Sequence, residues 1–553
     1  MAAPALLAFN LPPSATFLNE AAALVGWGGF LLVLTAVLPG RRWPAGPGLA
    51  ALMASLALLL GAALASPLWA HLPWALGLSG AGMILAAALA AMVGAAAQVG
   101  GASAAAFRAF CIGLVIAGVA SSLIGIVQVF ASQWPDGDWV ARTYIVGTAV
   151  GNMRQPNHLS SLLVWSVVAA VWLSDAGVIN RWLGTGLTLL FIFVIVLSGS
   201  RTGTVSVGLL ALWGILDRRL SRHARVLLLL APVAYAIFWF GAAAWADYGH
   251  HVFGGEQRFA PKKDISSSRF GIWSNTLSLI AMHPWAGVGF GELNFAWTLT
   301  PFPGRPVAFF DHTHNIVLQF AVELGLPLAV LVLALLGWAL FCAWRAAEDP
   351  TRRAALVMVL MILLHSLLEY PLWYAYFLLP AAFAFGICLG RPDDAHATAP
   401  SGSRPLLIAS MLLMLGGVAS VADYARVVAI FAPAEGAPPL AQRIAAGQRS
   451  VLFAHQADYA AATTAEHPAD ALGSFRRAPH NLLDARLMIA WAKALDESGD
   501  TERARYIAQR LKEFRNDQAA EFFAPCDIKT RPGVPPPFQC LPPTQSLGYA
   551  DFR

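Results

Sequence analysis

The amino-acid sequence predicts an all-α polytopic membrane protein with about twelve transmembrane helices, a large extracytoplasmic loop and a C-terminal soluble helical domain. Composition is the first reason: 58% of the 553 residues are hydrophobic, 12% are charged, and the mean hydropathy is +0.61, well above the values of soluble domains. The second reason is that apolar runs long enough to cross a bilayer recur along most of the chain. A transmembrane β-barrel would show short alternating segments instead.

The apolar runs are interpreted as spans in chain order, with ends defined to within several residues. The run at 203–216 is short, and the run at 314–344 is long enough to tilt or break. Residues 1–20 carry no Lys or Arg, so we expect no cleavable signal peptide. The predicted spans lie roughly at 22–39, 48–66, 74–98, 107–131, 158–174, 182–198, 203–216, 226–245, 314–344, 354–370, 371–390 and 405–421.

The arginines indicate which connections face the cytoplasm. They gather in alternate short loops, which the positive-inside rule assigns to the cytoplasmic side. These arginines are Arg41, Arg42, Arg218, Arg219, Arg222, Arg225, Arg345, Arg352, Arg353, Arg391 and Arg404. The loops 132–157 and 246–311, both termini and the tail then face the opposite side. The long loop nevertheless carries cations whose partners the sequence does not reveal, namely Arg258, Lys262, Lys263, Arg269 and Arg305.

Four regions follow from this topology. We expect N-terminal transmembrane helices over 1–245, a large catalytic loop over 246–311, C-terminal transmembrane helices over 312–421 and a helical tail domain over 422–553. Their compositions differ, because the tail is much more charged than the spans.

The tail contains two recognisable features. Residues 482–514 resemble one helix hairpin of a helical repeat, with Gly499 and Asp500 as its turn. Cys526 and Cys540 lie in polar sequence, and a cysteine pair there suggests a disulfide formed in an oxidising compartment.

Several function classes find no support. The net charge of +5 and the pI near 9.0 reflect loop arginines rather than a basic stripe with aromatics, so we expect no nucleic-acid partner. There is no Walker A sequence and no nucleophile elbow. A catalytic metal is not expected, because the closely spaced Asp311, His312 and His314 match no HExxH or paired CxxC pattern. The sequence implies no cofactor.

The stretch "FFDHTHNIVLQFAVELG", residues 309–325, concentrates polar groups at the start of an apolar run. Spaced by four residues, Asp311, Asn315, Gln319 and Glu323 would form one drifting stripe on a helix. Polar groups in a membrane helix face a cavity or bond to neighbouring helices. For Gln319 and Glu323 both interpretations stay open. His312 and His314 lie at the water-facing end, where an imidazole suits proton transfer near neutral pH.

Two arginines on the same side are candidate anion ligands. Arg201 in "LSGSRTG" lies at a helix end, where it either snorkels to the interface or supplies a fixed cation. Arg269 opens an amphipathic stretch that ends in the glycine-rich "GVGFGE". No βαβ unit surrounds this motif, so a tight turn is expected rather than a dinucleotide site.

Two further polar stretches face the same side. In "GNMRQPNHLSSLLVW", Arg154, Gln155 and His158 accompany Asn157, and Asn157 or Ser160 is expected to cap the helix after Pro156. In "LLHSLLEYPLWYAYFLLP", His365 and Glu369 are one helical turn apart, which also fits a structural pair. The aromatic residues of that stretch are typical of an interfacial belt: Tyr370, Trp373, Tyr374 and Tyr376.

Together these groups suit one kind of chemistry. Guanidinium forks match phosphate oxygens, so a membrane-embedded substrate with a pyrophosphate head would fit. Pyrophosphate is a weakly basic leaving group that needs charge neutralisation, whereas an acceptor hydroxyl must lose a proton. A histidine and two arginines therefore suffice for glycosyl transfer from a lipid pyrophosphate.

The chain resembles the superfamily of O-antigen ligases and O-antigen polymerases, which are bacterial envelope glycosyltransferases. "SGSRTG", "SSSRFGIW…HPWAGVGFGE" and "HTHNIVLQFAVELG" occur in the family's order, and His314 and Gly325 match its His-x10-Gly pattern. Within the superfamily the chain is most similar to the protein O-oligosaccharyltransferases, or pilin glycosylation ligases, through "MRQPNHLSSLL", "HSLLEYPLWYAYFLLP" and the tail with "PFQC". Arg269 lacks the Arg-x10-Gly spacing of the polymerases.

The resemblance implies that His314 is the catalytic histidine and that Arg201 and Arg269 bind the pyrophosphate. It also implies transfer of a preassembled glycan from undecaprenyl pyrophosphate to Ser or Thr of an exported, pilin-like protein. The enzyme would lie in the bacterial inner membrane, with its site, its large loop and its tail in the periplasm. Further residues are expected to bind or shape the substrate: His312, Asn315, Gln155, Asn157, His158, Arg154, Glu369 and Tyr370.

Three alternatives stay open. A lipid A-core ligase or an O-antigen polymerase would keep the chemistry and change the acceptor. A lipid-linked oligosaccharide flippase or another transporter would need charged groups within the spans, whereas here they gather at one face. A structural envelope protein with a partner-binding tail is the third.

Overall fold

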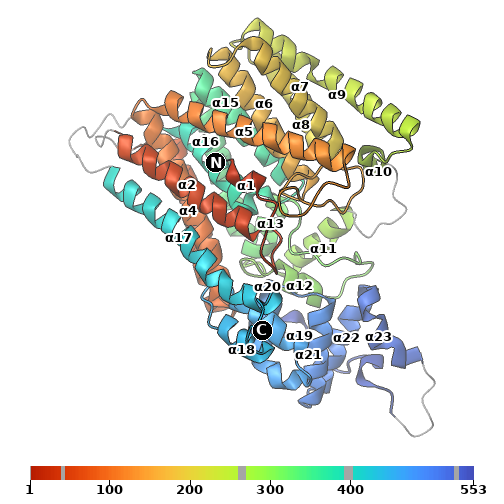
Figure 1. The fold of residues 1–553 in the computed structure, drawn as a ribbon. Coiled ribbons are helices and arrows are strands. Elements are labelled where there is room, and N and C mark those ends of the chain that lie inside the picture. The colour runs from red at the N-terminus through yellow and green to blue at the C-terminus, as the bar shows by residue number, and fades with distance from the viewer. Residues whose placement is uncertain (1, 39–43, 260–268, 392–402, 528–534) are drawn as a thin grey trace. The chain divides into compact units, whose positions relative to one another are not determined.

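The computed structural model describes residues 2–38, 44–259, 269–391, 403–527 and 535–553, and helices dominate these ranges (Figure 1). Nine of the described helices are long and apolar enough to cross a membrane. The predicted all-α polytopic membrane architecture is therefore confirmed. The nine are α2 (Phe17–Val37), α3 (Pro47–Trp69), α4 (Trp74–Val99), α5 (Ser103–Phe130), α6 (Pro156–Asp175), α7 (Arg181–Ser198), α9 (Arg222–Gly249), α14 (Leu326–Ala346) and α17 (Ser403–Phe431).

Shorter helices lie between these nine. The expected spans at 203–216, 354–370 and 371–390 correspond to helices of 15 to 17 residues, of which α8 and α16 are strongly apolar. The shorter helices before the tail are α1 (Ala3–Leu6), α8 (Arg201–Leu216), α10 (Gly254–Phe259), α11 (Arg269–Met282), α12 (Leu293–Leu299), α13 (Ile316–Leu324), α15 (Pro350–Ser366) and α16 (Ala375–Leu389). Arg41, Arg42, Lys262 and Lys263 lie outside the described residues.

The expected span at 314–344 is broken. Helix α13 ends at Leu324, Gly325 follows with a φ of 77°, and α14 begins at Leu326. Only glycine adopts this backbone region without a steric penalty. The polar residues of α13 consequently belong to a separate nine-residue helix and not to the spanning helix.

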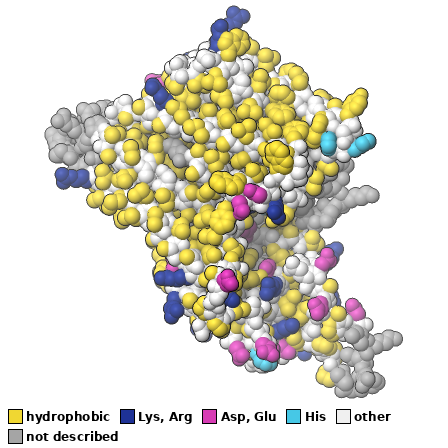
Figure 2. Space-filling view, in the orientation of Figure 1, with side chains coloured by type: hydrophobic (Ala, Val, Ile, Leu, Met, Phe, Trp, Pro, Cys, Tyr) yellow, Lys and Arg dark blue, Asp and Glu magenta, His cyan; other side chains and the backbone are white. Residues whose placement is uncertain are grey.

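The tail is helical, and its predicted hairpin is present. Helices α21 (Ala485–Glu497) and α22 (Thr501–Glu513) are joined at Gly499, whose φ is 88°, and the Asp500 side chain caps α22. Charged side chains gather over the tail in the space-filling view, whereas hydrophobic ones cover the visible face of the spanning helices (Figure 2). The other tail helices are α18 (Leu440–Gly447), α19 (Ala454–Thr464), α20 (Ala478–Asn481) and α23 (Ala520–Phe523).

The chain divides into two compact units. The first, which we call the bundle unit, comprises Met1–Ala54, Leu85–Pro261 and Leu335–Val421. The second, the loop–tail unit, comprises Ser55–Ile84, Lys262–Ala334 and Ala422–Arg553. The long connection and the tail thus fold together although they are far apart in sequence.

Helix α6 forms the centre of the bundle unit, and every side chain from Pro156 to Leu173 is buried. A helix buried on all sides has to bond its polar groups to its neighbours. The Trp165 indole donates to the Met358 carbonyl at 2.9 Å, and the Ser166 hydroxyl donates to the Leu114 carbonyl at 2.9 Å. These bonds fix α6 between α15 and α5.

The long connection and the tail share a hydrophobic core in the loop–tail unit. Phe295, Trp297 and Leu299 of α12 pack with Trp491 of α21 and Phe514, and all five are at most 5% exposed. Figure 1 shows α12 beside α20 at this core. The long connection therefore has tail residues as its packing partners.

Candidate functional site

The segment 311–315 is an ordered loop that ends in a helix cap. The buried Thr313 N–H donates to Oε1 of Gln319 at 2.8 Å, and its hydroxyl donates to the Asn315 carbonyl at 2.7 Å. The Asn315 side chain accepts from the N–H groups of Val317 and Leu318, and so caps α13. Asn315 acts here as a helix cap, a role that Asn favours.

His314 lies between Thr313 and Asn315, whose hydrogen bonds fix this segment, and its φ is 55°. A non-glycine residue in the left-handed region is uncommon and persists only where the surrounding structure determines it. The side chain is half-buried, and its ring makes an edge contact with Phe310 at 6.0 Å between centroids. The backbone on both sides of the imidazole is therefore fixed while the ring itself keeps access to solvent.

The prediction that four polar residues form one stripe on a helix is wrong for Asp311 and Asn315. Asp311 precedes α13 and Asn315 caps it, so only Gln319 and Glu323 lie on the helix. These two are buried and bond to each other at 2.8 Å. Asp311 instead pairs with His312, with 2.9 Å between Oδ1 and Nδ1.

Gly325 lies at a close approach of two backbone segments. A Cβ at this position would lie 2.3 Å from the Trp285 carbonyl oxygen. A Cβ at Gly287 would likewise lie 2.5 Å from the backbone of Glu323. The ten residues between His314 and Gly325 are the cap residue Asn315 and the nine residues of α13. The spacing is thus the length of one short helix with its N-cap.

Arg269 opens α11, which is tied to the histidine segment. The Trp273 indole, one turn after Arg269, donates to the Thr313 carbonyl at 3.0 Å. Residues four apart share a helix face, so Arg269 lies on the face of α11 that bears this bond. The arginine is half-buried.

The bundle unit holds a second group of polar residues, which we call the α6 cluster: Asn157, Ser160, Ser161, Ser200, His365 and Glu369. All six are buried. The Asn157 amide donates to Glu369 at 3.1 Å and accepts from the Ser200 hydroxyl at 2.7 Å. Ser161 Oγ and His365 Nδ1 are 2.7 Å apart. His365 and Glu369 thus both have partners on α6.

The expected cap of α6 is corrected. The Gln155 side chain accepts from the His158 N–H at 2.8 Å and is the cap, and Pro156 takes the first helical position. Pro is favoured there because it lacks the N–H that would have no partner. Neither Asn157 nor Ser160 caps the helix, and both belong to the α6 cluster.

One residue of the expected aromatic belt, Tyr376, faces inward. Tyr376 is buried, and its hydroxyl is 3.0 Å from Nδ1 of His158. Tyr374 packs edge-on against the same imidazole at 4.6 Å and stacks with Tyr370 at 6.0 Å. Trp373 remains partly exposed. These rings enclose His158, and the belt interpretation is wrong for Tyr376.

The two candidate site arginines of the bundle unit differ in their surroundings. Arg201 is exposed and takes the first position of α8, directly after the cap Ser200 that bonds to Asn157. Arg154 has a φ of 57°, and its guanidinium donates to the carbonyls of Ala8 and Ala15. Arg154 therefore holds the N-terminal segment beside the residue that caps α6.

The loop–tail unit contains buried ionic contacts that sequence reasoning missed. Glu292 and His480 are 2.8 Å apart and at most 3% exposed in their side chains. Burial raises the pKa of Glu292, although His480 and Arg553 beside it act in the opposite direction. A glutamate directly after a glycine-rich turn is the only local signal, because its partner lies 188 residues away.

Arg305 shows what one of the loop cations holds. Its guanidinium bonds the carbonyls of Trp297 and Thr298 at 3.1 Å, lies 3.3 Å from Glu513, and stacks over Phe514. Burial lowers its pKa to about 10, against the opposing effect of Glu513. The arginine stays charged near neutrality and joins the loop to the tail.

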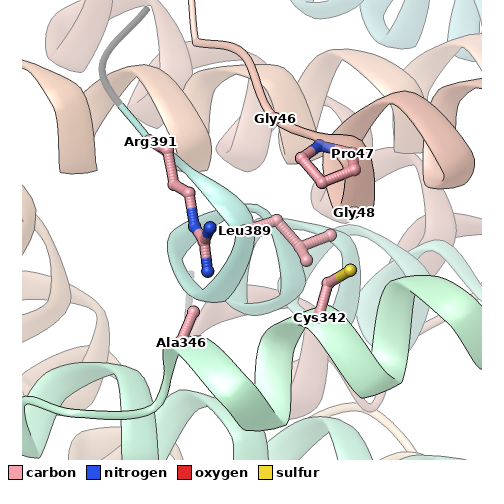
Figure 3. A pocket seen from close by; sticks show the side chains of 7 residues that line it. All are labelled: Gly46, Pro47, Gly48, Cys342, Ala346, Leu389 and Arg391. Atoms are coloured by element: carbon pink, nitrogen blue, oxygen red, sulfur yellow. The ribbon is translucent and has the colours of Figure 1, made fainter.

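The disulfide and one small pocket involve other residues. Cys526 and Cys540 are bonded, with 5.3 Å between their Cα atoms, a usual spacing. The pocket lies in the bundle unit between the start of α3 and the ends of α14 and α16 (Figure 3). Among the described residues that line it, Arg391 is the charged group and Cys342 the thiol, and none is a predicted site residue.

Three segments match known families. Residues 186–333 match the family described as O-antigen ligase, residues 353–524 match the C-terminal part of the virulence factor membrane-bound polymerases, and residues 149–173 match the protein glycosylation ligases. The first match contains Arg201, Arg269 and His314, and the third contains Arg154 to His158.

Two curated proteins of Acinetobacter baylyi are similar to the chain. A general O-oligosaccharyltransferase is 26% identical over 280 residues, which is 48% of this chain and 48% of that protein. A ComP-specific O-oligosaccharyltransferase is 24% identical over 251 residues, 43% of this chain and 44% of that protein. The chain thus spans about half the length of the curated relatives that it matches.

Proposed function

The chain belongs to the O-antigen ligase superfamily, and from this premise we propose that it is a protein O-oligosaccharyltransferase. It would transfer a preassembled oligosaccharide en bloc from undecaprenyl pyrophosphate to Ser or Thr hydroxyls of exported, pilin-like proteins. The names of the two relatives and the match of residues 149–173 to protein glycosylation ligases support this choice of acceptor.

The proposal assigns the proton transfer to His314. As the acceptor hydroxyl oxygen attacks the anomeric carbon, its proton passes to the imidazole. The bond from the anomeric carbon to the pyrophosphate oxygen breaks, and its electron pair leaves with the lipid pyrophosphate. A single displacement of this kind inverts the anomeric configuration and needs no metal. One observation carries the assignment: a half-buried imidazole on a braced, left-handed backbone directly before a helix cap.

The proposal assigns the phosphate charge to Arg201 and Arg269. Guanidinium groups form bidentate bonds with phosphate oxygens. Each arginine occupies the first residue of a helix, where the helix dipole also favours anions. Charge neutralisation at the departing pyrophosphate is worth several kilocalories per mole in comparable sites, on the order of 3 kcal/mol for each donor.

The remaining candidates would support these three residues. His312 and Asn315 flank His314, and Gln155 and Arg154 shape the start of α6. Asn157 and Glu369 would act through the α6 cluster, and His158 and Tyr370 through the rings around them. The site would face the periplasm from the bacterial inner membrane, and membrane lipid would surround the spans.

The decisive experiment is a transfer assay with purified enzyme, a defined lipid-linked glycan and a pilin acceptor. His314→Ala should abolish the mass increase of the acceptor, whereas the exposed tail residue His467 should tolerate the same change. Full transfer by His314→Ala would refute the assignment.

A second candidate function is O-antigen polymerase or lipid A-core ligase. The match of residues 353–524 to the membrane-bound polymerases favours it. Mass spectrometry of exported proteins from a deletion strain separates the two. Loss of protein-linked glycan with unchanged lipopolysaccharide supports the protein acceptor, and the reverse pattern supports the alternative.

A further inference from the structure

Helix α13 is held at its C-terminal end by the backbone of the glycine-rich turn 284–291. The Val288 N–H donates to the Val322 carbonyl at 2.8 Å, and the Gly289 N–H donates to the Glu323 carbonyl at 3.1 Å. The Leu326 N–H donates to the Pro284 carbonyl at 2.7 Å. A nine-residue helix has little stability of its own, so the position of α13 depends on the position of this turn.

The tail holds the other side of the same turn. The Arg553 guanidinium donates to the Val288 carbonyl, lies 3.9 Å from Glu292 and stacks over Tyr549. His480 pairs with Glu292 at 2.8 Å. Val288 thus bonds α13 through its N–H and the tail through its carbonyl. A continuous chain of contacts leads from Arg553 through Val288 to Val322 on α13.

Residues 544–553, which we call the strap, bring Arg553 to this place. The Glu502 carboxylate of α22 accepts from the Thr544 N–H and hydroxyl and from the Gln545 N–H, at 2.6 to 3.1 Å. Phe552 is buried against Trp491 and Tyr506 at 5.5 and 5.3 Å between ring centroids. Both ends of the strap are therefore anchored within the loop–tail unit.

We propose that Arg553 and His480 are positioning residues for His314, and that they act by holding the 284–291 turn against α13. This inference rests on the proposed function of His314. The tail then contributes to catalysis without touching either substrate. Loss of the contacts that Arg553 and His480 make with the turn and with Glu292 lets α13 and its N-terminal cap shift. A shift of about 1 Å at a catalytic group can lower the rate by up to about 100-fold.

The first test measures backbone protection in the full-length protein in detergent. In Arg553→Ala, amide hydrogen exchange at Val288, Gly289 and α13 should accelerate by about tenfold or more. The exposed Arg449 of the same unit provides the control, and Arg449→Ala should leave exchange unchanged. Unchanged exchange in Arg553→Ala overturns the proposal whether or not the enzyme transfers glycan.

The second test separates positioning from substrate binding. Arg553→Ala and His480→Gln should lower kcat by about tenfold or more while KM for the lipid-linked donor changes less than about twofold. Arg553→Lys keeps a cation beside Glu292 and should restore part of the rate. A rise in KM alone, or an unchanged kcat despite faster exchange, overturns the positioning role.

The two tests also separate this proposal from the proposed function. If His314→Ala transfers glycan at the full rate, the proposed function fails even when Arg553→Ala alters exchange. If Arg553→Ala does not fold, His480→Gln replaces it, because this variant removes the imidazole that pairs with Glu292 and should accelerate exchange and lower kcat. Arg553→Lys keeps a cation beside Glu292 and should change both less. Equal exchange in His480→Gln and the unmodified protein would then overturn the proposal.

Discussion

The α6 cluster and the His314 segment deal with polar groups in opposite ways. In the α6 cluster, amide, hydroxyl, imidazole and carboxyl groups are buried and bond to one another between α6, α8 and the end of α15. In the His314 segment, hydrogen bonds of Thr313 and Asn315 support the backbone, and the imidazole is half-buried in edge contact with Phe310. A polar group in the membrane must find partners, whereas a catalytic group has to reach substrate.

The difference predicts different consequences of mutation. Removing one member of a closed buried network leaves its partner unsatisfied and lowers stability. Removing an imidazole from a segment that the backbone supports changes the chemistry and leaves the fold in place. Substitutions in the two regions should therefore affect stability and rate separately.

The largest effect should come from His314. Asn tolerates the left-handed backbone at this position and cannot act as a base. His314→Asn should therefore lower kcat by roughly 100- to 10,000-fold without lowering the melting temperature. A melting temperature that falls together with the rate would make His314 structural and remove the contrast with the α6 cluster.

The second largest effect should come from Gly325, which allows the turn before α12 to pack closely against the end of α13. Gly325→Ala places a Cβ 2.3 Å from the Trp285 carbonyl at a φ of 77°, and we expect a loss of roughly 2–4 kcal/mol of stability. A Cβ at Gly337 in α14 would instead meet open space, with no heavy atom of the described chain within 4 Å beyond its own helix and chain neighbours. Gly337→Ala is the matched control and should be neutral or slightly stabilising. Chemical denaturation measures the free energy of unfolding of both variants. Equal values would contradict the role of Gly325 in supporting α13.

The sequence predicts those features of the fold that depend on residues close together in the chain. Hydropathy is local, so the spans and the α21–α22 hairpin were recognisable. The length of the run at 314–344 allowed a break, but the position of the break at Gly325 and the cap by Gln155 were not recognisable, because each depends on a choice between neighbouring residues that local pattern leaves undecided.

Contacts between distant residues lay beyond such reasoning altogether. Glu292 and His480 are 188 residues apart, and the sequence contains no periodicity that relates them. The same holds for Asn157 and Glu369, which are 212 residues apart. The candidate residues were recognisable by type and motif, whereas their partners required the fold.

A third prediction tests the α6 cluster directly. Asn157→Ala removes the donor to Glu369 and the acceptor of Ser200, so we expect a loss of roughly 1–3 kcal/mol. Ser206→Ala is the control, because the buried Ser206 hydroxyl donates to the Thr202 carbonyl of its own helix and so makes a bond within α8. Thermal unfolding in detergent measures both. An Asn157→Ala protein that keeps its melting temperature would show that the cluster is not a closed stabilising network.

The smallest effect concerns His455 of α19, which is half-buried and belongs to the loop–tail unit. Burial lowers the pKa of His455 to about 4, against the opposing charge of Asp458 and with a further contribution from Arg477. The folded protein thus favours the neutral imidazole. The resulting stability is present above the ordinary pKa of about 6.5 and is lost as the pH falls toward 4. Between about pH 7 and about pH 5.5 the loss should be roughly 1 kcal/mol. Protection factors, which correct for the slower intrinsic exchange at lower pH, should therefore fall for the amides of α19 over this interval. His455→Gln cannot ionise and should remove this fall, while the protection factors of the α6 cluster stay unchanged in both proteins.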